Sequence, residues 1–439
     1  SVELSVISVE LSVISVELNV ISVELSVAKC RSHGFFMCHF DLQSFNIEKF
    51  YLMSVKIDDG RYSRLELITW WDQNILKNAR VFVAGCGALG NEIIKNLSML
   101  GIGHIYVADM DRVEKSNLTR SVLFRKEDEG KPKAAVAAKG ARQINDEIDI
   151  KWFDGNIFNL GLGVFKDFDI IIGGLDNREA RLYINQSCWK INRPWIDGAI
   201  EVLNGVARMF VPPQGACYEC TMSELDYKLI NKRKSCMLLG IDEILEGKIP
   251  TTPTIASIIA AVEVQEAVKY LHRREDLILL SGKGMIFSGG INDSYIIEYQ
   301  RNEDCPSHYT FERIELFKKE FSDVKISDII DFGKSIFGGG EFNIDFNNEV
   351  VYELVNEDKM KVTEYYGNMN TMSVKDVKTG EGNFQKIKSF NTLGSESALA
   401  KRLEAKTLSE LKLPINDILT LRKGEEEIHL EFESTEVFT

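Results

Sequence analysis

The chain has 439 residues, of which 44% are hydrophobic and 27% are charged, so it has ample material for a globular core and for about two or three domains. Its net charge of −14 argues against a general nucleic-acid binder, because phosphate contacts need clusters of Lys and Arg that no long run supplies. No apolar run approaches the roughly 20 residues of a membrane helix and no secretory leader is visible, which predicts a cytoplasmic protein without a membrane partner.

The first segment is repetitive. Residues 1–27 repeat a seven-residue unit, SVELSVI, whose apolar positions lose phase between units and build neither a strand face nor a coiled-coil seam. Residues 28–52 have no clear periodicity, and Met53 stands just before the first informative motif. We interpret residues 1–52 as a low-complexity or mis-assigned start that activity does not require.

A βαβ pattern begins at Arg80. The apolar strand VFVAG is followed by a glycine-rich turn, the helical segment NEIIKNLSMLG and a second strand, HIYVAD. A third strand, within DIIIGGLDN at 169–177, is a continuous apolar run, as in parallel strands that are buried on both faces. We predict a Rossmann-like, mainly parallel and doubly wound α/β sheet, with functional residues at the carboxyl ends of its strands.

The glycine-rich turn suggests a nucleotide site. Gly85, Gly87 and Gly90 form Gly-x-Gly-x-x-Gly after a strand, so bare backbone can approach a phosphate at a helix N-terminus. Asp109 ends the next strand, where a carboxylate can hold ribose hydroxyls. This pattern suits a dinucleotide as well as ATP, and it also occurs as a purely structural turn.

The cysteines indicate a metal site. Cys217 and Cys220 form Cys-x-x-Cys, and Cys305 and His308 repeat that spacing far downstream. Tetrahedral zinc accepts thiolate and imidazole alike, so the four residues would close a structural site. The alternative for His308 is an exposed loop histidine. Metal or thiol chemistry is favoured over a disulfide framework because the eight cysteines are unevenly placed.

Four further segments, in a fixed order along the chain, bear on whether the nucleotide is ATP or a dinucleotide. RYSR lies at 61–64, DMDRVEKSNLTR at 109–120, GKPK at 130–133 and GGLDN at 173–177. With them, residues 61–310 resemble the superfamily of ubiquitin-activating enzymes and molybdopterin-synthase adenylyltransferases. The resemblance implies an E1-type enzyme that uses ATP and magnesium to adenylate the C-terminal carboxylate of a ubiquitin-like protein.

The resemblance also implies roles for single residues. Asp109 would bind the ribose and Asp176 magnesium, and the other residues of the nucleotide site would be Gly85, Gly87, Gly90, Asp111, Asn117, Arg120 and Lys133. Arg120, Lys133 and magnesium would offset the charge that builds up when a carboxylate attacks an α-phosphate. Arg64 would reach into a neighbouring subunit's site, which implies a homodimer. Leu65 and Ser121 depart from the family, which usually has glutamine after each arginine.

Two further expectations follow from the family. Cys236 lies where activating enzymes place the cysteine that takes the acyl group as a thioester, and the nearby run Lys232–Lys234 favours a thiolate. The alternative is a small apolar core residue beside MLLG. The family usually has a second Cys-x-x-Cys where this chain has Cys305 and His308, which leaves His308 as the weakest zinc ligand.

The expected domain layout is an adenylation domain at 53–315, braced by zinc, a linker at 316–341 and a small α+β domain at 342–439. The end of the chain, KTLSELKLPINDILTLRKGEEEIHLEFE, is compatible with a β-grasp, or ubiquitin-like, fold. The layout resembles activating enzymes of the NEDD8 type and of bacterial ubiquitin-like operons, in which such a domain recruits a conjugating enzyme. Two alternatives remain: a sulfur-carrier adenylyltransferase without a thioester step, and a non-catalytic subunit that binds a ubiquitin-like protein.

Overall fold

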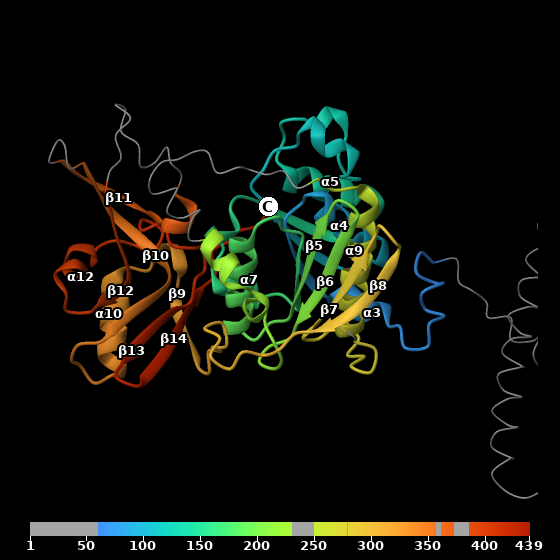
Figure 1. Cartoon of the computed structure of the whole chain (residues 1–439). Coiled ribbons are helices and arrows are strands. Elements are labelled where there is room, and N and C mark those ends of the chain that lie inside the picture. Colours follow the sequence, from blue (N-terminus) through green and yellow to red (C-terminus); the bar gives the residue numbers. More distant parts are fainter. Residues whose placement is uncertain (1–59, 231–249, 279, 357–360, 373–385) are drawn as a thin grey trace, which may run out of the picture. The chain divides into compact units, whose positions relative to one another are not determined.

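The computed structural model describes residues 60–230, 250–278, 280–356, 361–372 and 386–439. The chain divides into two units, 1–60 and 61–439, and both sheets lie in the second. The predictions for residues 1–52 and for Cys236 lie outside the described residues. Within the second unit the strands form an eight-stranded and a six-stranded sheet (Figure 1).

The eight-stranded sheet has the order β3-β2-β1-β4-β5-β6-β7-β8. The pairs from β3 to β5 are parallel, and those from β5 to β8 are antiparallel. This confirms the Rossmann-like, mainly parallel prediction. Its strands are β1 (Arg80–Ala84), β2 (His104–Asp109), β3 (Asp149–Asp154), β4 (Ile170–Gly173), β5 (Trp195–Glu201), β6 (Asn204–Phe210), β7 (Lys283–Ser288) and β8 (Asp293–Glu298).

Helices cover both faces of this sheet, because alternate residues of the buried strands point to opposite sides. Val81 and Val83 of β1 pack with α4 (Ala88–Leu100), α5 (Lys133–Ile144) and α9 (Pro253–Leu271). Phe82 and Ala84 pack with α6 (Leu162–Lys166) and α7 (Arg178–Lys190) on the other face. The short helix α3 (Gln73–Asn78) precedes β1. Among the described residues, no helix is long and apolar enough to cross a membrane.

The strand order places a topological switch point between β1 and β4. After β1 the chain adds β2 and β3 on one side, and it then returns to add β4 on the other side of β1. The connections that leave β1 and β4 therefore diverge to opposite faces, and open α/β sheets bind their ligands at the carboxyl ends of two such strands. The glycine-rich turn follows β1 and the GGLDN loop follows β4, so both lie at this point.

The six-stranded sheet forms the core of a second α+β domain. Its order is β11-β10-β13-β14-β9, and β12 also pairs with β10. Only the pair of β9 and β14 is parallel. The elements are β9 (Ile314–Glu320), α10 (Ile326–Ile336), β10 (Asn343–Asn356), β11 (Lys361–Asn368), β12 (Lys386–Gly394), α12 (Ala398–Leu403), β13 (Leu419–Lys423) and β14 (Glu426–Glu433).

Residues 316–341, which we predicted to be a linker, form regular secondary structure over most of their length. Most of β9 and all of α10 lie in this range, and both belong to the second domain. Ile326, Ile329, Ile330 and Gly333 of α10 are buried, which is the i, i+3, i+4, i+7 spacing of an amphipathic helix. At the end of the chain β13 and β14 pair as an antiparallel hairpin, whereas the β-grasp, or ubiquitin-like, fold stays a prediction.

Two glycines join the two sheets' domains by close backbone contact. Gly161 N donates to Ile415 O at 2.8 Å, and Gly163 N donates to Asn416 O at 2.9 Å. A Cβ atom on Gly161 would lie 2.3 Å from the backbone of Asp417, whose buried carboxylate accepts a hydrogen bond from Leu162 N. No residue larger than glycine fits at position 161 unless the backbone moves.

We therefore expect Gly161→Ala to lower the free energy of unfolding by about 1–3 kcal/mol, the usual cost of overpacking. Urea denaturation of the purified protein measures this change. Gly290→Ala is the matched control, because a Cβ atom there meets no heavy atom within 4 Å. Equal stability of the two variants would contradict the tight junction.

Candidate active site

Packing requires glycine at two positions of the glycine-rich turn, Gly85 and Gly90, but not at Gly87. Gly85 has a φ of +91° and its Cβ would lie 2.7 Å from Gly174 O, and a Cβ on Gly90 would lie 1.9 Å from Gly85 O. Gly87 has neither constraint, since no heavy atom lies within 4 Å of its Cβ position. It is the N-cap of α4 and offers no side-chain cap. Open space therefore lies over uncapped N–H groups, as in a phosphate-binding turn.

Asp109 ties the end of β2 to this turn. One carboxylate oxygen accepts from Cys86 N at 2.7 Å, and the other accepts from Asp111 N at 2.8 Å. Burial raises the pKa of Asp109, and the cation of Lys133 opposes this shift. Each carboxylate oxygen keeps a second lone pair, so Asp109 can still accept a hydrogen bond from a hydroxyl.

Lys133 forms an ion pair with Asp111 and also feels the charges of Asp109 and Asp176. It is the first residue of α5, and its Nζ lies 2.8 Å from the Asp111 carboxylate. Burial lowers the pKa of Lys133, but the charges of Asp109, Asp111 and Asp176 outweigh it and leave the pKa above its ordinary value. Lys133 is therefore a permanent cation at neutral pH. Three carboxylates and one ammonium leave a negative excess, and oxygen donors of this kind suit magnesium.

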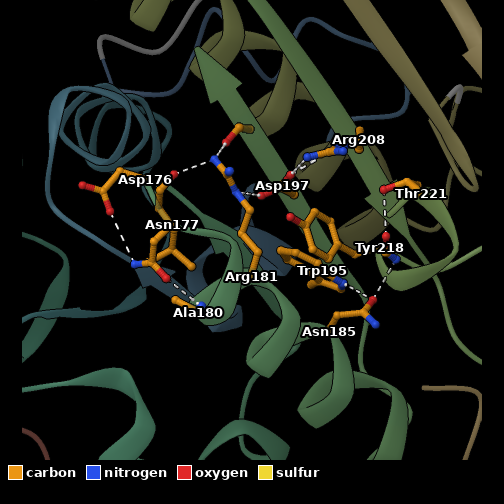
Figure 2. A network of polar contacts seen from close by, with 12 residues as sticks. Asp176, Asn177, Ala180, Arg181, Asn185, Trp195, Asp197, Arg208, Tyr218 and Thr221 are labelled. Carbon is orange, nitrogen blue, oxygen red and sulfur yellow. Dashed lines mark hydrogen bonds and ion pairs between the residues drawn. The ribbon is translucent and has the colours of Figure 1, made fainter. Parts of the chain in front are cut away.

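Asp176 is held by its backbone, and its carboxylate is exposed. Gly174 N donates to Ala84 O at 2.8 Å, so the loop after β4 packs on the end of β1. Asn177 caps α7 through a 2.8 Å hydrogen bond from Ala180 N to its side-chain oxygen (Figure 2). Its amide nitrogen lies 3.5 Å from Asp176 Oδ1, at the limit of hydrogen bonding. The Asp176 carboxylate thus has lone pairs available for a ligand.

Three predicted site residues are not joined to this cluster by a hydrogen bond or ion pair among the described residues. Asn117 uses its side-chain oxygen to accept from Glu114 N at 2.9 Å and so caps the 3-10 helix at Lys115–Thr119. Arg120, which follows this helix, donates to Ser116 O at 2.7 Å. Arg64 is exposed and has no polar partner within the described part of the chain.

The predicted metal ligands do come together. The ligand atoms of Cys217, Cys220, Cys305 and His308 all lie within 4.8 Å of one another. Cys217 Sγ lies 3.7 Å from Cys220 Sγ and 3.6 Å from Cys305 Sγ. These distances match the edge of a tetrahedron with metal–sulfur bonds of about 2.3 Å, which is about 3.8 Å long. His308 Nε2 lies 3.3 Å from Cys220 Sγ, so His308 is part of the cluster and not a free loop histidine.

The cluster's surroundings also suit a structural metal. Trp189 stacks on the His308 ring with the centroids 4.7 Å apart, which fixes the plane of the imidazole. Cys217 and Cys305 are buried, and His308 Nδ1 is buried without a hydrogen-bond partner. Three thiolates and an imidazole are a closed set of zinc ligands with no open position, which fits bracing and not catalysis.

A buried charged network, which the sequence does not reveal, lies next to the loop that carries Asp176. Asp197 of β5 is fully buried and pairs with Arg181 and Arg208, and Glu263 of α9 is fully buried nearby (Figure 2 shows the first three). Asp197 and Arg208 face each other in the register of β5 and β6. The sequence carries no distinctive signal for these residues, because Asp, Glu and Arg are usually exposed.

Two other cysteines can be compared with Cys236 as nucleophiles. Cys86 and Cys188 are fully buried, and burial raises the pKa of both thiols well above its ordinary value. A buried thiol that stays protonated is a poor nucleophile. Neither cysteine competes with Cys236 for that role.

The sheet order, the open glycine turn and Lys133 beside Asp111 are typical of nucleotide-binding α/β proteins, and the chain adds a Cys/His cluster that could hold a metal ion. Comparison with protein families narrows this class, because the ThiF family matches residues 61–307, more than half of the chain. The chain belongs to the ThiF family.

Three similar proteins show what the chain resembles. The NEDD8-activating enzyme E1 catalytic subunit of Arabidopsis thaliana is 39% identical over 156 residues, which cover 33% of this chain and 34% of that protein. The SAMP-activating enzyme E1 of Haloferax volcanii is 28% identical over 250 residues, which cover 56% of this chain and 87% of that protein. A crystal structure of E. coli MccB is 26% identical and covers 58% of this chain and 75% of MccB, with a TM-score of 0.48. The match thus spans only about a third of the Arabidopsis relative.

Proposed function

We propose that this protein uses ATP to adenylate the C-terminal carboxylate of a ubiquitin-like protein. The observation that carries the proposal is the cation of Lys133, whose Nζ lies 2.8 Å from the Asp111 carboxylate, while Asp111 N donates to Asp109 at the end of β2, beside the open N-terminus of α4. Membership of the ThiF family and the activating enzymes among its relatives support ATP over a dinucleotide.

The chemistry is the attack of a carboxylate oxygen on the α-phosphorus of ATP, with pyrophosphate as the leaving group. The two reactants are anions, so cations must offset their repulsion. Lys133 supplies a permanent positive charge, and the N–H groups at the start of α4 favour phosphate. Asp109 binds the ribose hydroxyls with its remaining lone pairs. Asp176 is the residue that would hold magnesium, which lowers the negative charge of the phosphates when bound.

ATP–pyrophosphate exchange tests this proposal. The protein is mixed with ATP, magnesium, labelled pyrophosphate and one candidate ubiquitin-like protein at a time. We expect label to enter ATP only when a partner with a free C-terminal carboxylate is present. The same partner with an amidated C-terminus is the control, because it lacks the nucleophile. Exchange that is equal with both forms would contradict the proposal.

The later steps are a finer part of the proposal. Cys236 would take the acyl group from the adenylate as a thioester, with AMP as the leaving group, and the 342–439 domain would bring in a conjugating enzyme that receives it. Arg64 would complete the site of a second copy in a homodimer. Its exposure, without a polar partner among the described residues, supports that role.

We also propose that Cys217, Cys220, Cys305 and His308 bind one structural zinc ion. His308→Cys is expected to retain zinc, because thiolate is an equivalent ligand, whereas His308→Ala is expected to lose it and several kcal/mol of stability. Structural zinc contributes apparent binding free energies of about 10–16 kcal/mol in small zinc-finger peptides, so loss of a ligand is costly. Elemental analysis after gel filtration, with thermal melting, measures both effects. A zinc content unchanged in His308→Ala would remove His308 from the ligand set.

A further inference from the structure

Arg181 is the contact between the buried charged network and the loop that carries Asp176. Its Nη2 donates to Leu175 O at 2.6 Å and to Gly198 O at 3.0 Å (Figure 2). Leu175 directly precedes Asp176, and Gly198 lies in β5. One guanidinium therefore joins the loop after β4 to the neighbouring strand.

A buried carboxylate, that of Asp197, also holds the same guanidinium in place. Arg181 Nε lies 2.8 Å from Asp197 Oδ1, and the other Asp197 oxygen accepts from Arg208 Nε at 3.1 Å. The side chains are 12% exposed for Arg181 and fully buried for Asp197. Removing one partner of such a pair leaves an uncompensated charge in the interior, so the network holds one arrangement.

Glu263 of α9 is buried beside the network, and neither of its carboxylate oxygens has a hydrogen-bond partner among the described residues. A Cβ atom on Gly198 would lie 2.5 Å from Glu263 Oε2 and 2.6 Å from Leu89 of the glycine-rich turn. Burial raises the pKa of Glu263, and the cations of Arg181 and Arg208 oppose this shift. The strand that receives Arg181 is thus packed tightly between Glu263 and the nucleotide turn.

The loop itself needs such an anchor. The Asp176 side chain is exposed and makes only the 3.5 Å contact with Asn177, so its position depends on the backbone. On the β1 side, the loop is held by the hydrogen bond from Gly174 N to Ala84 O. On the β5 side, Arg181 is the side chain that holds it among the described residues.

We propose that Arg181 is a positioning residue that sets the affinity of the Asp176 carboxylate for magnesium in the nucleotide site. This inference rests on the proposed function. Arg181 acts through the carbonyl of Leu175, and its network with Asp197 and Arg208 keeps it in place. It is distinct from Lys133 and Asp176, which would face the substrate.

The test compares the magnesium dependence of ATP binding in wild type, Arg181→Lys and Arg181→Met. Isothermal titration with ATP is repeated over a series of magnesium concentrations. We expect the magnesium concentration for half-maximal binding to rise about 10- to 100-fold in Arg181→Met, the usual effect of losing a group that orients a metal ligand. Arg181→Lys keeps the ion pair with Asp197 but lacks the forked donors, so we expect it to fold like wild type and to show a smaller rise.

Arg193→Met is the matched control. Arg193 also donates to a backbone carbonyl, that of Lys166, at 3.1 and 2.8 Å, but it lies just beyond the other end of α7. We expect this variant to lose stability without a change in magnesium dependence. A folded Arg181→Lys with wild-type magnesium dependence would overturn the inference, as would an equal rise in Arg193→Met. Wild-type protein that binds no ATP with magnesium would overturn the proposed function instead.

Discussion

Asp176→Asn is expected to reduce ATP–pyrophosphate exchange by about 100-fold or more, the effect of removing one preorganised electrostatic group from a reacting centre. The substitution keeps the size of the side chain and removes its charge. The carboxylate is exposed and has only one long polar contact, so little stability should be lost. The fold should remain intact while magnesium binding fails.

Exchange rates at saturating ATP, together with a thermal melt, measure this effect. Asp331→Asn is the control, because Asp331 is an exposed aspartate on α10 of the other domain. We expect it to stay within about twofold of wild type, as exposed substitutions usually do. Wild-type exchange in a well-folded Asp176→Asn would remove this residue from the magnesium site.

Cys236→Ser is expected to abolish a reductant-sensitive adduct with the ubiquitin-like protein and to leave ATP–pyrophosphate exchange largely intact. The hydroxyl of serine is a much weaker nucleophile than a thiolate, and an ester formed on it resists reductant. The first step uses the residues of the nucleotide site and no thiol, so it should not depend on Cys236.

A non-reducing gel, run with and without thiol, measures the adduct, and exchange is assayed in parallel. Cys38→Ser is the control, because Cys38 lies in the segment that we predict to be dispensable. An adduct that survives in Cys236→Ser would place the nucleophile elsewhere. Loss of exchange as well would make Cys236 part of the adenylation site.

Sequence reasoning places Asp109 and Asp176 close together because each follows a parallel strand that neighbours β1, and their roles in a nucleotide site stay a prediction. Asp109 follows from β2 and Asp176 from the loop after β4, and the parallel register of β1 with both strands places their carboxyl ends together. The cysteines were equally predictable, since a Cys-x-x-Cys-like spacing that occurs twice in one chain is typical of a metal site. The side-chain directions of Arg64 and Arg120 could not be predicted, because long exposed side chains adapt to a ligand.

The buried network lay beyond sequence reasoning for a different reason. Asp197 and Arg208 meet only because β5 and β6 pair in one register, and Arg181 arrives from a helix. Helix α10 differs from the buried network, because its apolar spacing can be recognised in the sequence ISDIIDFGKSI. The packing of Ile326 and Ile329 against the second sheet overturns the prediction of a linker at 316–341.

The most direct test of adenylation follows an oxygen atom. The ubiquitin-like partner is prepared with a heavy oxygen isotope in its C-terminal carboxylate and is incubated with the protein, ATP and magnesium. The AMP released when thiol or water cleaves the adenylate is then analysed by mass spectrometry. Attack of the carboxylate on the α-phosphorus predicts that AMP carries one heavy oxygen. Unlabelled AMP, or label in pyrophosphate, would contradict the account.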